Sequence, residues 1–132
     1  MTEAILKREL VRQLLREGGF ARRLEDKYAI GTLDLLLLTH RHLIYAEAKL
    51  LNDIAAMPAT VKQRDQIKIF NEVGNRHARA LVLGLKDKAI GFNLPGRKWD
   101  EHYTMPWPLV GTRSLTEHLD NAVDEIFAQE LA

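Results

Sequence analysis

The sequence predicts an α/β fold in the order helix–strand–strand–helix–strand, with a central mixed sheet flanked by helices. Apolar residues recur at helical spacing near both ends and in the middle of the chain, whereas the apolar runs between them have the length of strands. Glycine and proline residues separate these segments, as expected for turns and helix ends. Such an order is typical of layered structures built around a hydrophobic core.

The first helix is predicted over residues 2–17, where leucines recur on one face. The Gly18-Gly19 pair would end this helix, because glycine tolerates the left-handed conformation that follows many helices. The polar residues 20–30 are predicted to form a connection that could include a short strand.

Two strands are predicted next. Residues 32–38 are apolar on both faces, which is typical of a central strand, and polar residues enter the second strand, residues 43–50. A hairpin turn between them would carry His40 and His42. Two imidazoles without a third ligand are a weak signal for zinc, so we predict that both are solvated at the tip.

The second half begins with a helix over residues 60–73, with Thr60 as the N-cap. A buried strand is expected over residues 79–85 and a short one over 89–92. Residues 93–112 are expected to be irregular, and the Ser114-Leu-Thr-Glu117 capping box predicts a last helix.

The domain organisation follows from the length. A chain of 132 residues suits a single domain over residues 1–132, with a core (1–92), an irregular aromatic and basic segment (93–112) and a C-terminal helix (113–131). In the irregular segment Trp99, Tyr103 and Trp107 could stack on bases. We favour packing, because tryptophan is highly buried on average.

Composition excludes some functions. The chain has no cysteine, which rules out disulfides and thiolate zinc sites. No apolar run approaches the roughly 20 residues that span a bilayer, so we expect a cytoplasmic protein without a membrane partner. The net charge is +1, with basic residues gathered in 7–27 and acidic residues in the last helix. This asymmetry could steer a polyanion, although two solvated helices explain it equally well.

The candidate site lies on the two predicted strands. If residues 39 and 42 pair across the turn, Asp34 lies directly opposite Glu47, with Cβ atoms about 5 Å apart. Two carboxylates among leucines are costly unless a cation neutralises them, and their oxygens suit Mg²⁺. The carbonyl of Ala48 could also reach the metal. Lys49 shares the face of Glu47 and could orient a water or neutralise a phosphate.

A surface hairpin with one cross-strand ion pair would contain the same residues. Asp34, Glu47 and Lys49 by themselves are therefore a weak signal for an active site. However, Gly31-x-x-Asp34 followed by Glu47-x-Lys49 resembles the signature of the PD-(D/E)XK nucleases. The run from Gln63 to Gly74, followed by a Val/Leu strand, resembles the VRR-NUC branch. Small archaeal Holliday-junction resolvases are more distantly similar in layout.

This resemblance covers roughly residues 3–85 and implies a restriction-endonuclease-like core. Leu33 stands where VRR-NUC proteins usually place proline. The family often adds a glutamate from the first helix. Glu3 is preferred over Glu9 because it shares the stripe of Leu6, Leu10 and Leu14, although it could simply occupy a frayed first turn.

The resemblance also implies that Gln63 contacts the active site, with Gln66 as a competitor and an ordinary first-turn role as the alternative. Taken together, these residues predict a metal-dependent nuclease that hydrolyses DNA with Mg²⁺, for which Mn²⁺ could substitute. The substrate would be branched or flap-structured DNA, or DNA reached through a targeting partner. Arg22, Arg23 and Lys27 would contact phosphates.

A homodimer is expected from the resemblance, and the apolar stripe of the last helix could supply its interface. The alternative is a non-catalytic module of the same fold that binds nucleic acid or protein. A third reading is an unrelated interaction domain. The choices between DNA and RNA, and between endo- and exonucleolytic cutting, stay open.

Overall fold

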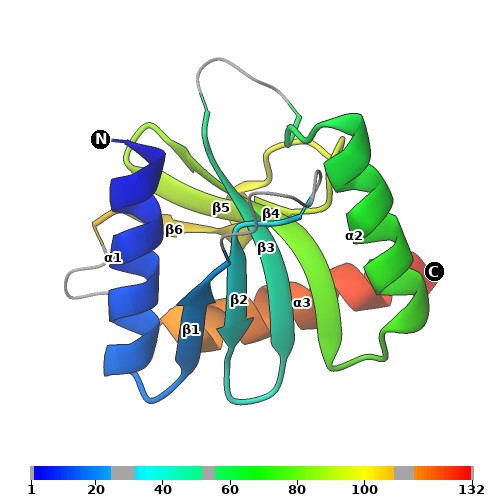
Figure 1. Cartoon of the computed structure of the whole chain (residues 1–132), viewed down its shortest axis with the longest axis horizontal. Coiled ribbons are helices and arrows are strands. Elements are labelled where there is room, and N and C mark those ends of the chain that lie inside the picture. Colours follow the sequence, from blue (N-terminus) through cyan, green and yellow to red (C-terminus); the bar gives the residue numbers. More distant parts are fainter. Residues whose placement is uncertain (1, 25–31, 52–55, 109–114, 132) are drawn as a thin grey trace.

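The computed structural model describes residues 2–24, 32–51, 56–108 and 115–131. Its centre is a six-stranded sheet in the order β1-β2-β3-β4-β5-β6, shown in Figure 1. The strands are β1 (Phe20–Arg23), β2 (Leu35–Leu38), β3 (Leu43–Leu50), β4 (Ala78–Lys86), β5 (Ala89–Asn93) and β6 (Thr104–Pro106). The helices are α1 (Glu3–Arg16), α2 (Val61–Val73) and α3 (Leu115–Leu131), with a short 3₁₀ helix, η1 (Glu101–Tyr103).

The sheet is mixed. Only β3 and β4 are parallel, and α2 forms the crossover between them, while the remaining neighbours pair antiparallel. A parallel pair needs such a crossover because the chain must return to the same end of the sheet. The predicted α/β fold, a mixed sheet flanked by helices, is therefore confirmed.

The helices cover opposite faces of the sheet. The leucine stripe of α1 and the apolar residues of α3 share one core cluster with alternate residues of β2, β3 and β4. Ile67 of α2 belongs to a second cluster with Ala80 and Val82 of β4. Because neighbouring residues of a strand point to opposite faces, α1 and α3 lie on one side and α2 on the other. In Figure 1, α3 passes behind the strands.

Gly18 and Thr60 act at the helix ends as predicted. The Thr2 hydroxyl accepts the Ile5 N–H at the start of α1, and Gly18 follows the helix with a φ of +85°. Thr60 caps α2, and Gly74 is its C-cap. Ser114 of the predicted capping box lies outside the described residues. The Glu17 carboxylate accepts the backbone N–H groups of Leu115 and Thr116 at the start of α3.

The apolar stripe of α3 is not available as a dimer interface, which corrects the expectation above. Leu115, Leu119, Val123 and Ile126 are all at most 2% exposed and pack into the core of their own chain. These side chains pack against the sheet, on the same face that α1 covers, so they are not exposed to a partner.

The prediction for the β2–β3 turn is correct for His40 and wrong for His42. The Thr39 N–H donates to the His42 carbonyl, which gives the expected register, and His40 is exposed. His42 is buried, with its Nε2 2.8 Å from an Asp124 carboxylate oxygen, and its ring lies 5.8 Å from that of His77. Burial follows because α3, more than 70 residues later in the chain, packs over the turn.

The segment after β5 is more regular than expected, because residues 104–106 add β6 to the sheet edge. Tyr103 and Trp107 are buried in the main core, which confirms packing for both. Trp99 is half-buried and lies against Gly91, where a Cβ atom would come within 2.8 Å of its ring. Among the helices that the structure describes, none combines the length and apolar character needed to cross a membrane.

Candidate active site

Asp34 lies in a bend immediately before β2, and the backbone on both sides of it is held in place. The Leu33 N–H donates to the Tyr45 hydroxyl at 2.9 Å, and the Leu33 side chain is fully buried. The Asp34 carbonyl accepts the Leu24 N–H at 2.7 Å, next to β1. Leu33 thus anchors the bend, and the Asp34 carboxylate is half-buried just before the start of β2.

Glu47 and Lys49 lie on β3, on the face that α2 covers. The β2–β3 pairing ends at Leu35 and Ala46, so Asp34 and Glu47 are the next residues beyond the ladder, and their carboxylates interact with each other. The Glu47 side chain is only 5% exposed, and the Lys49 Nζ lies 3.4 Å from the Glu47 Oε1 atom. The sequence register that brings the two carboxylates together is therefore present in the structure.

The backbone of Ala48 completes the arrangement. Its N–H donates to the Asp34 Oδ2 atom at 3.3 Å, in the place where β2 would otherwise have continued the ladder. In a strand the N–H and C=O of one residue point to the same edge. The Ala48 carbonyl therefore projects from the edge of β3 that faces Asp34, where β2 no longer pairs with it.

The electrostatics of Glu47 are unusual for a glutamate. Burial and the neighbouring Asp34 carboxylate raise the pKa of Glu47 to about 7, and Lys49 opposes this only in part. The Glu47 Oε2 atom is buried and receives no hydrogen bond from any residue that the structure describes. A buried acceptor without a donor is costly, so this oxygen is suited to binding a cation.

These donors fit a hard divalent metal. Asp34, Glu47 and the Ala48 carbonyl offer oxygen ligands only, which is the ligand set that Mg²⁺ prefers, with waters completing its coordination. Within the described part of the chain, no group of three or more histidine, aspartate and glutamate side chains gathers to hold a metal. Two carboxylates therefore suit a metal that keeps several waters and contacts substrate.

The other predicted residues lie at different distances from this pair. Contrary to the expectation, Glu3 is exposed in the first turn of α1, so it does not share the burial of the stripe formed by Leu6, Leu10 and Leu14. The Gln63 side chain accepts the Thr60 N–H at 3.0 Å, so its amide oxygen serves the capping box of α2. Arg22 and Arg23 are exposed on β1, opposite Leu36 and Leu35 of β2. Lys27 and Gly31 lie outside the described residues.

One charged residue at the site was not anticipated from the sequence. The Lys7 Nζ lies 3.1 Å from the Asp34 Oδ2 atom, and the two side chains are 17% and 21% exposed. Lys7 follows the buried Leu6, so it borders the leucine stripe of α1. That position at the edge of the buried stripe was the only available signal, and it does not indicate which residue Lys7 would contact.

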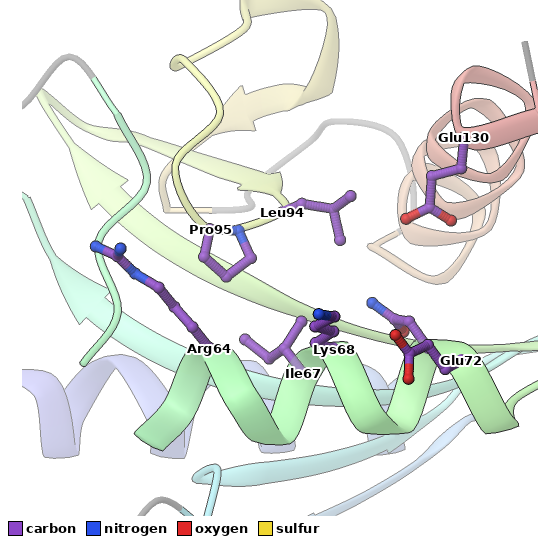
Figure 2. Close-up of a pocket in the computed structure, with 8 residues that line it drawn as sticks. Arg64, Ile67, Lys68, Glu72, Leu94, Pro95 and Glu130 are labelled. Atoms are coloured by element: carbon purple, nitrogen blue, oxygen red, sulfur yellow. The ribbon is translucent and has the colours of Figure 1, made fainter. Parts of the chain in front are cut away.

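A cavity with apolar walls lies away from the carboxylate pair. A space of about 420 Å³ opens between α2, the turn after β5 and the end of α3 (Figure 2). Ile67, Leu94 and Pro95 give it apolar walls, and the charged side chains at its rim come from α2 and α3. None of the residues lining it belongs to the carboxylate pair, so this cavity is separate from the candidate metal site.

Comparisons with known proteins support the fold. The structure is similar to that of a Holliday junction resolvase, Hjc, from the archaeal hyperthermophile Archaeoglobus fulgidus, with a TM-score of 0.56 and 15% sequence identity. The match covers 88% of this chain and 97% of the resolvase. No protein-family model matches the sequence, and no curated protein matches it. At this identity the similarity shows a shared restriction-endonuclease-like fold and leaves the activity open.

Proposed function

We propose that this protein is a metal-dependent nuclease that hydrolyses DNA phosphodiester bonds at the site formed by Asp34, Glu47 and Lys49. The observation that carries this proposal is the pair of opposed carboxylates, one of which has a buried oxygen without a donor among the described residues. A purely structural pair of this kind would weaken the fold, because like charges face each other in a poorly solvated place. The fold similarity to a resolvase adds support.

The residues of the chain divide the work. Asp34, Glu47 and the Ala48 carbonyl hold Mg²⁺, or Mn²⁺ in its place. When bound, the metal supplies Lewis-acid polarisation of a phosphoryl oxygen and lowers the pKa of a coordinated water. Lys49 neutralises charge that builds on the phosphate and orients the attacking water. Glu3 in the first turn of α1 and the amide nitrogen of Gln63 in the first turn of α2 would assist this cluster.

The substrate that we propose is branched or flap-structured DNA. A chain of this size has little surface for reading sequence, and the structurally similar archaeal protein is a Holliday junction resolvase. Arg22 and Arg23 on the neighbouring strand β1, together with Lys27, contact phosphates and so position the DNA. A homodimer would present two sites to the two sides of a branch, and its interface lies outside the buried stripe of α3. Within the superfamily we favour the VRR-NUC branch.

The test is cleavage of a DNA panel in Mg²⁺ or Mn²⁺, using supercoiled plasmid, linear duplex, a flap and a four-way junction. Wild type should cut at least one substrate, and Lys49→Ala should lower the rate by about 10²- to 10³-fold. Lys62→Ala, at an exposed position of α2, is the matched control and should leave the rate unchanged. If wild type cuts nothing and binds no metal, the catalytic proposal is wrong and the non-catalytic module becomes the better explanation.

A further inference from the structure

The site contains two ammonium groups from separate elements of the fold. Lys49 belongs to β3 and contacts Glu47, whereas Lys7 belongs to α1 and contacts Asp34. The helix that carries Lys7 is fixed to the core by Leu6 and Leu10, which are fully buried. The packing of α1 therefore fixes the backbone of Lys7 beside the site, and its side chain is mostly buried there.

The Lys7 ammonium occupies the position of a cation on Asp34. It approaches the same oxygen, Oδ2, that accepts the Ala48 N–H, and it is mostly shielded from solvent. The carbonyl oxygen of the same residue, Ala48, is the third oxygen ligand of the proposed metal site. A divalent cation on Asp34 and an ammonium 3.1 Å from the same carboxylate would repel each other strongly in this half-buried setting.

The charges of the four side chains also balance. With the carboxylates ionised, Asp34 and Glu47 carry two negative charges, and Lys7 and Lys49 carry two positive charges. A bound divalent cation would bring the net charge to +2. The phosphodiester gains one more negative charge as hydroxide attacks it. A site with a net positive charge therefore stabilises the transition state more than the ground state.

We propose that Lys7 is an internal cation of this active site, which holds Asp34 before metal binds and contacts the substrate phosphate once Asp34 has bound the metal. This inference rests on the proposed nuclease function and adds a residue to it. Lys7 approaches Asp34 from α1, whereas Lys49 extends from the face of β3 that α2 covers. The two ammoniums would therefore contact the phosphate from different sides.

The experiment measures Mn²⁺ affinity by calorimetry and single-turnover cleavage for Lys7→Gln and Lys7→Arg. In Lys7→Gln the dissociation constant for Mn²⁺ should fall about three- to tenfold, because Asp34 loses its competing cation, while the cleavage rate should fall at least tenfold. Lys7→Arg keeps the charge and should stay near the wild-type affinity with part of the activity. Circular dichroism confirms that each variant folds.

Arg12→Gln is the matched control, because it removes the same charge from α1 at a position that pairs with Glu9. It should change neither quantity by more than about twofold, since exposed charges are screened by salt. Unchanged or weaker Mn²⁺ binding in Lys7→Gln would overturn the inference, as would an unchanged cleavage rate in that variant. If wild type binds no Mn²⁺, the proposed function itself fails, and the inference fails with it.

Discussion

Acidic side chains lie at both ends of the β2–β3 hairpin, but those at the turn are well supplied with hydrogen-bond donors and those at the other end are not. At the turn, Asp124 of α3 accepts hydrogen bonds from His42 and Arg41, and the buried Asp120 accepts the Thr39 hydroxyl. Burial disfavours ionisation of Asp124, but the donors from His42 and Arg41 outweigh it and lower its pKa.

At the other end of the hairpin, which we call the open end, Asp34 precedes β2 and faces Glu47 of β3. Burial and the Asp34 carboxylate raise the pKa of Glu47 there, and one oxygen of Glu47 receives no hydrogen bond from the described residues. At the turn, each of the two α3 acids has a donor from the hairpin. These contacts fix α3 to the sheet and contribute to stability. At the open end Lys7 and Lys49 each contact one acid, but one buried oxygen of Glu47 still has no donor among the described residues, so an added cation could bind there. The comparison shows how a structural ion-pair network and a candidate active site differ within one hairpin.

The largest effect should appear when one acid is neutralised at each end. Glu47→Gln keeps the size of the side chain and removes the charge that holds the metal, so the rate of Mg²⁺-dependent cleavage should fall by about 10²- to 10³-fold. Asp124→Asn should stay within about threefold of wild type, because its carboxylate serves only the packing of α3. Single-turnover assays on the preferred substrate measure both, and equal losses in the two variants would erase the distinction.

The same two variants should change stability in opposite directions in the absence of metal. Because the folded-state pKa of Glu47 lies near 7, above the ordinary value of 4.5, the folded state binds the proton more tightly, and stability is lost as pH rises through that range. Glu47→Gln should therefore be more stable than wild type at pH 8, by on the order of 1–3 kcal/mol, and equal to it near pH 4. Urea unfolding at both pH values measures this.

For Asp124 the pKa is lowered, so its contribution is present above the ordinary value of 3.8 and is lost as pH falls. Asp124→Asn should cost about 1 kcal/mol at pH 7, a modest amount because 44% of the carboxylate side chain is exposed. The difference between variant and wild type should shrink in acid. A Glu47→Gln variant less stable than wild type at pH 8 would mean that the carboxylate pair serves the fold.

Local sequence patterns predicted the helices, most strands and the opposed carboxylates. The hairpin register needed only the turn length, which fixes the pairing of Leu35 with Ala46 and so the position of Asp34. Thr60 and Gly74 acted as caps because capping depends on residues only a few positions away.

The errors and omissions share one physical cause, since each depends on contacts between residues far apart in the chain. His42 is buried by Asp124 and its helix, and Glu17 caps α3 from 98 residues earlier. Lys7 reaches Asp34 only because α1 packs against the sheet. A single sequence shows which face of a helix is apolar, but not which residues border it in the fold.

Calorimetric titration of Mn²⁺ into wild type and Glu47→Gln at pH 8, without nucleic acid, tests directly whether Asp34 and Glu47 form a metal site. Wild type should show saturable binding, and the variant should lose at least tenfold in affinity. Wild-type binding should also release protons at pH 6.5, where Glu47 is partly protonated, and the variant should lack this contribution. Equal affinity in the two proteins would contradict the claim that the open end of the hairpin is a metal site.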